Sequence, residues 1–276
     1  MEVLLAKHAG FCFGVKRAIE IALKAAREYP PAFTLGPLIH NPQEVERLKG
    51  EGLGVINSLS EVPPGATVVI PSHGFPPEAL DEASRMGLRI VDATCPLVKR
   101  CQELAEEHRR EGLFTVVVGD PDHTEVRGIL GHAGPQAVAV PGADALPADL
   151  PREVGVICQT TQTAGLLASV AAALSRRDIA LRLHNTICRA TAQRQAAAAD
   201  LAGIVDVMLV VGGKNSSNTR RLAEACAGTG TPTFHVETAE EVDPGFVLRA
   251  RRVGVTAGAS TPGWVVEALL ERLRAL

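Results

Sequence analysis

LRIVDATCPLVKRCQELAEEH, residues 88–108, contains the structural unit from which the rest of the sequence can be interpreted. It opens with the apolar run LRIV, which is typical of a buried strand. Cys95 follows, and beyond it residues recur at steps of three and four, as on one face of a helix: Leu97, Cys101, Leu104 and His108. The stretch therefore predicts a strand, a turn that carries Cys95, and a helix.

The same unit occurs twice more, in GFCFGVKRAIE at residues 10–20 and in NTICRATAQRQ at residues 185–195. Each copy places a cysteine at the start of a helical pattern. The separations are 83 residues from Cys12 to Cys95 and 93 residues from Cys95 to Cys188. Such near-equal spacing indicates three copies of one supersecondary unit.

Apolar runs rich in Val and Ile predict further buried strands, and helical patterns separate them. The runs are TVVI, LRIV, FTVVV, EVGVIC, VDVMLVV and RRVGVTA. Strands that alternate with helices predict an α/β fold with mainly parallel sheets, covered by helices on both faces. A chain of 276 residues is long enough for two or three compact units. We place the boundaries of three α/β domains at the cysteines: 13–94, 95–187, and 1–12 with 188–276.

Polar motifs follow each cysteine at repeated distances. The distance is 28 residues from Cys12 to His40 in GPLIHN, from Cys95 to His123 in GDPDHTEV, and from Cys188 to Ser216 in GGKNSSN. A third motif comes later, at His73, Thr160 and Ser260. Turns after strands need small polar residues in any case. Ligands of open parallel sheets, however, bind beyond the carboxyl ends of the strands. Three units packed about a common axis would bring the thiolates and the polar residues together.

Three thiolates without a fourth ligand favour an iron-sulfur cluster with one open iron, because structural zinc normally has four protein ligands. The open iron would be the place where substrate binds. The remaining cysteines, Cys101, Cys158 and Cys226, are interpreted as small buried apolar residues.

The polar motifs suit an anionic ligand. They supply imidazole, hydroxyl and amide donors, and GGKNSSNTRRL is typical of a glycine-containing turn that opens a helix, where backbone N–H groups favour phosphate. Glu125 differs, because a carboxylate repels an anion unless it is protonated. We interpret Glu125 as a proton donor; the alternative is an exposed acid in a polar turn.

Composition excludes several classes of protein. The formal net charge of −3 argues against nucleic-acid binding through bulk charge, and no apolar run approaches the length of a membrane helix. The N-terminal apolar run is too short for a signal peptide. We therefore expect a cytoplasmic protein whose six cysteines are mostly reduced.

The motifs resemble, in order and over nearly the full length, the 4-hydroxy-3-methylbut-2-enyl diphosphate reductase family of the non-mevalonate isoprenoid pathway. The segments that carry the resemblance are GFCFGVKRAI, GPLIHNP, SHG, DATCPLV, HTEVRG, QTTQT, ICRAT, VVGGKNSSNTRRL and GVTAGASTP. Two positions depart from the family pattern. Thr124 stands where many members have Pro, and Gly263 stands where an acidic residue is common.

The resemblance implies a trefoil of three α/β domains around a central 4Fe-4S cluster, with Cys12, Cys95 and Cys188 as its ligands. It implies an iron-sulfur oxidoreductase that removes the substrate hydroxyl group and forms isopentenyl and dimethylallyl diphosphates. A ferredoxin- or flavodoxin-like protein would supply electrons. Catalytic candidates are Glu125, Thr160 and His123. Positions that would bind the allylic diphosphate are His40, His73, His123, Ser216, Ser217, Asn218 and Ser260.

Two other interpretations remain open. Quinolinate synthase also gathers three cysteines about an open iron in three α/β units, but its motifs do not match SHG or KNSSN. A non-enzymatic iron-sulfur redox sensor would need the cysteines alone, and would leave the Ser, Asn and His residues unexplained.

Overall fold

Twelve strands form three four-stranded sheets in the computed structural model, which describes residues 1–276. Every pairing between neighbouring strands is parallel. The chain divides into two units. Unit 1 contains Met1–Lys16, Ile39–Glu46 and Arg189–Leu276, and unit 2 contains Arg17–Leu38 and Arg47–Cys188.

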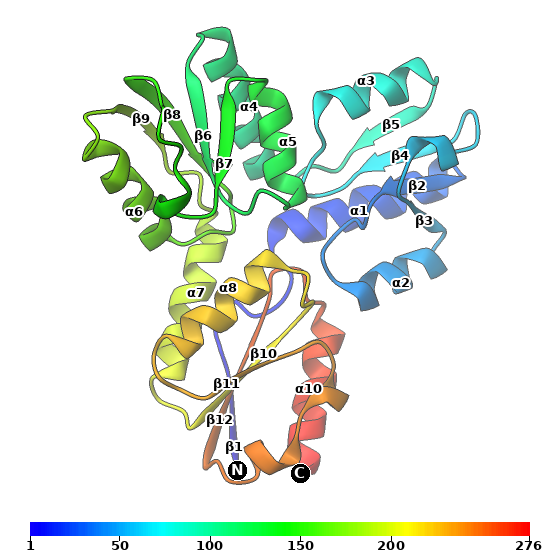
Figure 1. The fold of residues 1–276 in the computed structure, drawn as a ribbon. Coiled ribbons are helices and arrows are strands. Elements are labelled where there is room, and N and C mark those ends of the chain that lie inside the picture. Colours follow the sequence, from blue (N-terminus) through cyan, green and yellow to red (C-terminus); the bar gives the residue numbers. More distant parts are fainter. The chain divides into compact units, whose positions relative to one another are not determined.

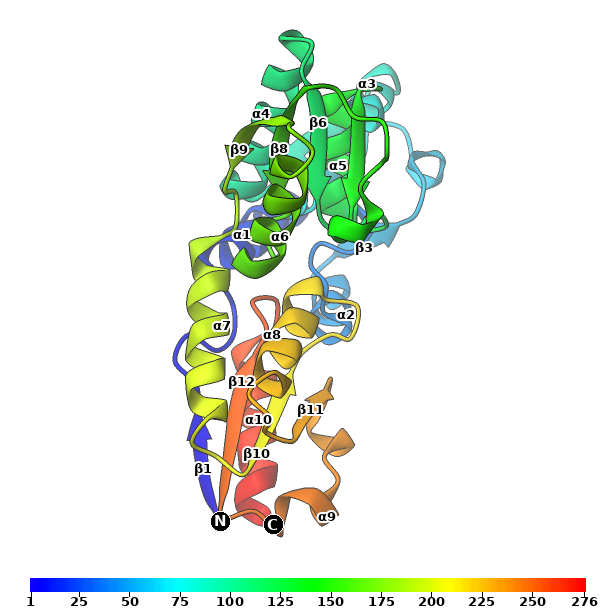
Figure 2. The same cartoon turned by 60° about the vertical axis from the view of Figure 1, so that its left-hand side comes forward.

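Unit 1 is built on sheet A, in which the strands lie in the order β1 (Glu2–Leu5), β12 (Arg252–Ala257), β10 (Val207–Val211) and β11 (Thr233–Val236). Helices α7 (Arg189–Ala202) and α8 (Ser217–Ala227) cover one face, as Figures 1 and 2 show. Helices α9 (Pro244–Val247) and α10 (Gly263–Ala275) cover the other. The first strand of the chain therefore completes a sheet formed by the last third.

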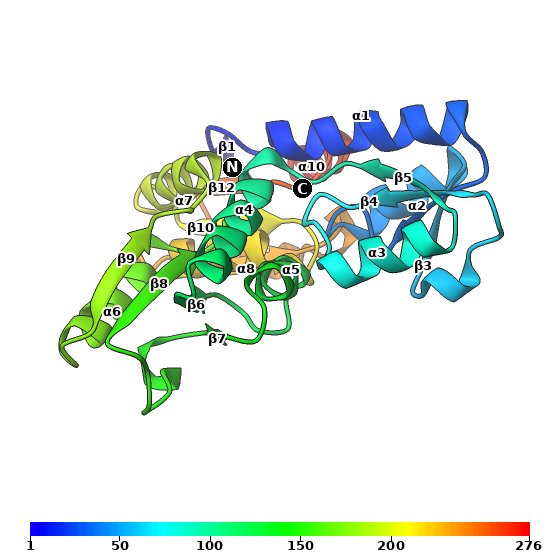
Figure 3. The ribbon, with the colours of Figure 1, turned by 90° about the horizontal axis from the view of Figure 1, so that it is seen from above.

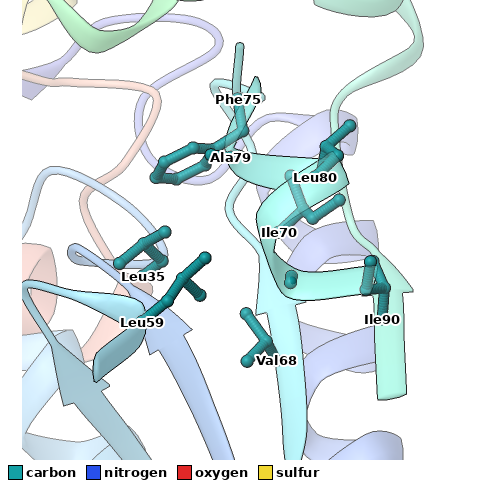
Figure 4. A pocket seen from close by; sticks show the side chains of 9 residues that line it. Leu35, Leu59, Val68, Ile70, Phe75, Ala79, Leu80 and Ile90 are labelled. Carbon is teal, nitrogen blue, oxygen red and sulfur yellow. The ribbon is translucent and has the colours of Figure 1, made fainter. Parts of the chain in front are cut away.

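Sheet B lies in unit 2, with strand order β3 (Leu53–Ile56), β2 (Ala32–Leu35), β4 (Thr67–Ile70) and β5 (Arg89–Asp92). Helix α3 (Pro77–Arg85) packs on one face, and the opposite face is covered by α1 (Phe13–Glu28), as seen in Figure 3. Helix α2 (Pro42–Gly50) follows β2. A cavity of about 10 Å³ remains between sheet B and α3; it is lined by apolar side chains and holds about one water molecule at most (Figure 4).

Sheet C, also in unit 2, has the strand order β7 (Ala137–Val140), β6 (Phe114–Val118), β8 (Glu153–Cys158) and β9 (Ala180–His184). Helix α6 (Ala164–Ser175) covers one face. Helices α4 (Pro96–Arg110) and α5 (Thr124–Ala133) cover the other. Three short 3-10 helices follow the outer strands β3, β7 and β11: Leu59–Glu61, Ala143–Ala145 and Ala239–Glu241.

The three sheets repeat one topology. Read from the outer 3-10-linked strand, their orders are β3-β2-β4-β5, β7-β6-β8-β9 and β11-β10-β12-β1. In each, the fourth strand is an edge strand that is followed by a cysteine and then a long helix. The prediction of three related α/β units with parallel sheets is confirmed. The domain boundaries placed at the cysteines stay a prediction.

All six apolar runs form strands, namely β4, β5, β6, β8, β10 and β12. In α4, Cys101, Leu104 and His108 are buried as expected, but Leu97 is 47% exposed. Leu97 lies in the first turn of α4, outside the cluster that the later turns form with sheet C. No helix has both the length and the apolar character that crossing a bilayer requires.

Candidate active site

The three predicted metal-binding cysteines occupy equivalent backbone positions. In each sheet, the cysteine N–H donates a hydrogen bond to a carbonyl in the turn after the neighbouring strand. The donor-acceptor distances are 3.1 Å from Cys12 to Ala259, 2.9 Å from Cys95 to Ser72 and 2.9 Å from Cys188 to Thr160. The repeat that the sequence spacing indicated is therefore reproduced in the hydrogen bonding.

The thiols of these cysteines are accessible, and each precedes a helix. Cys12, Cys95 and Cys188 are partly exposed, and none of them forms a disulfide. Cys95 is the N-cap of α4, and the N–H of Val15 in α1 points at Cys12 Sγ over 3.4 Å. The partial positive charge at a helix N-terminus stabilises a thiolate, which is the form that binds metal. These positions suit metal-binding thiolates.

The other three cysteines have a different environment. Cys101, Cys158 and Cys226 are fully buried, and all are free. Burial raises the pKa of Cys158 to about 12 and that of Cys226 to about 11, and it raises the pKa of Cys101 further. Such thiols stay protonated. Their predicted role as packing residues agrees with this environment.

Neither unit contains all three of the predicted metal-binding cysteines. Cys12 belongs to unit 1, whereas Cys95 and Cys188 belong to unit 2. No group of three or more His, Cys, Asp or Glu side chains is spaced to hold a metal ion. A ligand set shared by the three cysteines therefore stays a prediction.

Within unit 1, the structure brings together polar residues from three distant segments. Ser216 caps α8 by accepting a hydrogen bond from Thr219 N over 3.3 Å. Ser260 Oγ, after β12, lies 3.4 Å from Ser216 Oγ and donates to the carbonyl of His40 over 3.1 Å. Ser216 and Ser260 are buried. The predicted positions after β2, β10 and β12 thus meet at one end of sheet A.

The same place has the properties of an anion site. Ser217 and Asn218 lie buried in the first turn of α8, and Asn218 Nδ2 has no hydrogen-bond partner. A buried amide donor without a partner is unusual and suits a ligand that supplies an acceptor. Burial lowers the pKa of His40, because it disfavours the charged imidazolium.

Lys214, the one lysine in this turn, is engaged elsewhere. Its Nζ pairs with Glu241 Oε2 at 2.8 Å, and its backbone N–H donates to Glu237 Oε1. The preceding Gly213 leaves no room for a side chain, because a Cβ there would lie 2.6 Å from the carbonyl oxygen of His40. An anion bound at this place would therefore meet neutral donors and closely approaching backbone rather than a lysine side chain.

In unit 2, Glu125 and Thr160 form a buried pair. The N–H of Thr160 donates to Glu125 Oε1 at 2.7 Å, and Thr160 Oγ1 donates to Glu125 Oε2 at 3.0 Å. Burial raises the pKa of Glu125 to about 7, despite the two hydrogen bonds from Thr160, which lower it. The alternative of an exposed surface acid is wrong, because Glu125 is only 2% exposed.

His123 fixes the start of the helix that carries Glu125. It is the N-cap of α5, and its Nδ1 accepts a hydrogen bond from Glu125 N at 3.1 Å. The accepting Nδ1 leaves the proton on Nε2, which can donate to a ligand. Thr124, which replaces a common Pro, is the first residue of α5, and Glu125 keeps its place in the first turn.

His73 lies in the turn between β4 and α3 and is 4% exposed. This turn is closed by a hydrogen bond from Gly74 N to Pro71 O, and corresponding bonds run from Gln162 to Gln159 and from Thr261 to Gly258. The correspondence aligns His73 and Ser260 with Thr161. Thr160 is one residue earlier in its turn. By the hydrogen-bond pattern, the residue of sheet C equivalent to His73 and Ser260 is therefore Thr161 and not Thr160.

Sequence analysis missed the residues that hold the His40 segment. Asn41 Oδ1 accepts from Glu44 N at 2.9 Å and so caps α2, while Trp264 Nε1 donates to the buried Glu44 Oε2 at 3.4 Å. The Asn in GPLIHN was a usable signal, since Asn is favoured before a helix. No local pattern marks Glu44 or Trp264. Gly263 is the first residue of α10, and its N-cap is Pro262.

Polar side chains lie at the carboxyl ends of parallel strands in both units, with buried neutral donors in unit 1 and the buried acid Glu125 in unit 2, as is typical of α/β proteins that bind small ligands. The match of the LytB protein family to residues 3–274 makes this more specific. The chain belongs to the LytB family.

Relatives match over the whole length. A 4-hydroxy-3-methylbut-2-enyl diphosphate reductase of Geobacter sulfurreducens is 48% identical, over 99% of this chain and 97% of the relative. The enzyme of the same name from Anaeromyxobacter sp. (strain K) is 44% identical, over the full length of both chains.

Two solved structures are similar. One is (E)-4-hydroxy-3-methyl-but-2-enyl diphosphate reductase, described as the terminal enzyme of the non-mevalonate pathway; it is 41% identical, with a TM-score of 0.72 over the full length of both chains. The other is the E-1-hydroxy-2-methyl-but-2-enyl-4-diphosphate reductase from Plasmodium falciparum. It is 26% identical, with a TM-score of 0.93 over 98% of this chain and 87% of the other.

Proposed function

We propose that this chain is the oxidoreductase that removes the hydroxyl group of 4-hydroxy-3-methylbut-2-enyl diphosphate in the last step of the non-mevalonate pathway. The products are isopentenyl and dimethylallyl diphosphates. Full-length similarity to reductases of this name supports the assignment. The structural observation that carries it is a continuous link in unit 2, in which Cys188 N donates to Thr160 O and Thr160 N donates to Glu125 Oε1. A candidate metal ligand and a candidate acid are thus joined through one residue.

The donor set fits an iron-sulfur cluster. Cys12, Cys95 and Cys188 are the partly exposed cysteines of the chain, and each lies at the start of a helix. We propose that they hold a 4Fe-4S cluster with one open iron. When bound, the cluster supplies electrons one at a time and a Lewis-acidic iron for the substrate oxygen. A ferredoxin- or flavodoxin-like protein is the proposed electron donor.

The diphosphate binds to donors that the chain holds in advance. In unit 1 these are the N-terminal turn of α8, with Ser216, Ser217 and Asn218, together with Ser260 and His40. Helix N-termini favour phosphate through backbone N–H groups and the helix dipole. His73 and His123 of unit 2 complete the proposed set. Binding energy from the diphosphate orients the reacting carbon and excludes water.

Glu125 supplies a proton when the carbon-oxygen bond breaks. Its raised pKa keeps a large fraction protonated near neutral pH. Thr160 holds both carboxyl oxygens, which fixes the direction of the acid. The overall reaction takes up two electrons and two protons and releases water.

One assay separates this proposal from its alternatives. The anaerobic, iron-loaded protein is incubated with the hydroxymethylbutenyl diphosphate and a one-electron reductant, and isoprenoid diphosphates are measured. We expect both products, and we expect Glu125→Gln to abolish most turnover. Iron-loaded protein that forms neither product would exclude the reductase function and leave quinolinate synthesis or redox sensing.

A further inference from the structure

We propose that His132, together with Glu106, is a positioning residue for the turn that carries His73. The inference rests on the proposed function, because it takes His73 as part of the diphosphate site. His132 lies in the last turn of α5, and Glu106 lies in α4. Neither belongs to a motif that the function has used.

The hydrogen bonds of His132 show what it holds. His132 Nδ1 lies 2.7 Å from Glu106 Oε1, and His132 Nε2 lies 3.3 Å from the carbonyl oxygen of Phe75. A carboxylate and a carbonyl oxygen only accept hydrogen bonds, so each ring nitrogen of His132 faces an acceptor. Glu106 Oε1 lies against the largely buried ring of His132. His132 therefore fixes the carbonyl two residues after His73.

The residues of helix α5 that lie against this turn include two glycines, Gly128 and Gly131. A Cβ on Gly131 would lie 2.7 Å from Pro76 Cβ and 3.2 Å from Pro76 Cα. Gly128, one turn earlier, would place a Cβ 3.8 Å from the backbone of Phe75. The two glycines let the segment Phe75–Pro76 pack directly against the helix. Any side chain at residue 131 has to displace the backbone of that segment.

The turn is held from its other side as well. The ring of Phe75 points into the apolar cavity over sheet B, beside Leu35 and Leu59 (Figure 4). Gly74 has φ +75°, and a Cβ there would lie 2.3 Å from Gln102 Nε2 of α4. Phe75 is thus fixed by its ring on sheet B and by its carbonyl on α5.

This arrangement has a consequence for the site. The first turn of α5 carries Glu125 and is capped by His123, and its last turn carries His132. One helix therefore fixes the positions of both the proposed acid and the His73 turn. Loosening the turn should weaken diphosphate binding and leave the acid in place.

The test compares KM and kcat of the anaerobic, iron-loaded enzyme for the parent, His132→Ala, Glu106→Gln and Gly131→Ala. We expect KM to rise about tenfold for His132→Ala and Gly131→Ala, as for a lost buried hydrogen bond, with kcat within about twofold of the parent. Gly165→Ala in α6 is the control for the added methyl group, because a Cβ there meets nothing within 4 Å. Its KM should stay at the parent value.

A double-mutant cycle with His73→Ala decides whether His132 acts through the turn. Replacing His132 should raise KM no further once His73 is absent. The proposal would be overturned if the two substitutions raised KM additively. It would also be overturned by an unchanged KM in both His132→Ala and Gly131→Ala, or by a loss of iron in these variants. If His132→Ala fails to fold, the Gly131→Ala cycle with His73→Ala decides in its place.

A parent enzyme without turnover would refute the proposed function and this inference with it. Normal turnover with unaffected variants would refute the inference alone.

Discussion

Glu125 shows how burial and hydrogen bonding compete at a single residue. Two hydrogen bonds from Thr160 stabilise its carboxylate, yet the pKa rises to about 7 because complete burial removes the hydration of the charge. The carboxyl group is therefore half-protonated near neutral pH. A general acid is most effective when its pKa lies near the working pH. The position of Glu125 is thus chemically suited to its proposed role.

Replacing Glu125 by Gln tests this role. The variant keeps the size of the side chain and loses the acid, so turnover should fall by about 10²–10⁴-fold, while the diphosphate still binds. In the parent, turnover should decline as the pH rises through about 7, because the acid form is lost. Steady-state kinetics across pH, with calorimetric binding, provide the measurement. Turnover within about twofold of the parent would remove Glu125 as the proton source.

Binding of the diphosphate should be accompanied by proton uptake at His40. Burial lowers the pKa of His40 in the free protein, whereas a bound anion favours imidazolium and raises the pKa in the complex. Between these two pKa values the complex holds more protons than the free protein, and affinity falls as the pH rises. Calorimetry in two buffers of different ionisation enthalpy measures the uptake. The same uptake in His40→Asn would contradict the assignment.

At the scale of elements, sequence patterns predicted the strands that are rich in Val and Ile. Strands β6, β8 and β10 are almost wholly buried, and their continuous apolar runs identify them. Strand β9, with the sequence ALRLH, is largely exposed and has no such run. The four-residue strands β3, β7 and β11 lie at sheet edges, where their stability depends on pairing with a neighbour rather than on their own sequence.

Part of the candidate site could be predicted because its motifs recur in the three repeated units. Motif spacing identified Ser216, Ser260 and His40, and the structure brings them together. It could not identify His132 or Glu106, because their contact joins α5 to α4 across 26 positions and leaves no local pattern. Burial also lowers the pKa of His40, which composition alone does not show.

The N-caps of α8 and α6 offer a matched comparison of helix stability and binding. Ser216 accepts from Thr219 N in α8, and Thr163 accepts from Leu166 N in α6. Replacing either by Ala should lower the free energy of unfolding by about 1 kcal/mol. Only Ser216→Ala should also weaken diphosphate binding, by about 1–3 kcal/mol. Denaturant unfolding and calorimetric titration test this; equal affinity in both variants would place Ser216 outside the anion site.

At the scale of the whole molecule, Cys12, Cys95 and Cys188 occupy equivalent positions in the three sheets. Each follows the fourth strand of its sheet and donates its N–H to the adjacent turn. Cys12, Cys95 and Cys188, each changed singly to Ser, should lose most bound iron and most turnover. The three buried cysteines, Cys101, Cys158 and Cys226, should tolerate the same change with both retained. Iron analysis and visible absorbance report the outcome. Bleaching by Cys158→Ser with normal absorbance in Cys12→Ser would refute the assignment.

The pairing of β1 with β12 sets an order of events during synthesis. Sheets B and C are built from nearby segments and can form while the chain is still being made. Sheet A pairs Glu2 with Arg252, and the turn of Cys12 needs the carbonyl of Ala259. The last thiol position is therefore completed only when the ribosome has released the C-terminal strand. Loading of the proposed three-cysteine cluster must therefore wait for strand β12, and the N-terminal strand must stay unpaired, and protected from aggregation, until then.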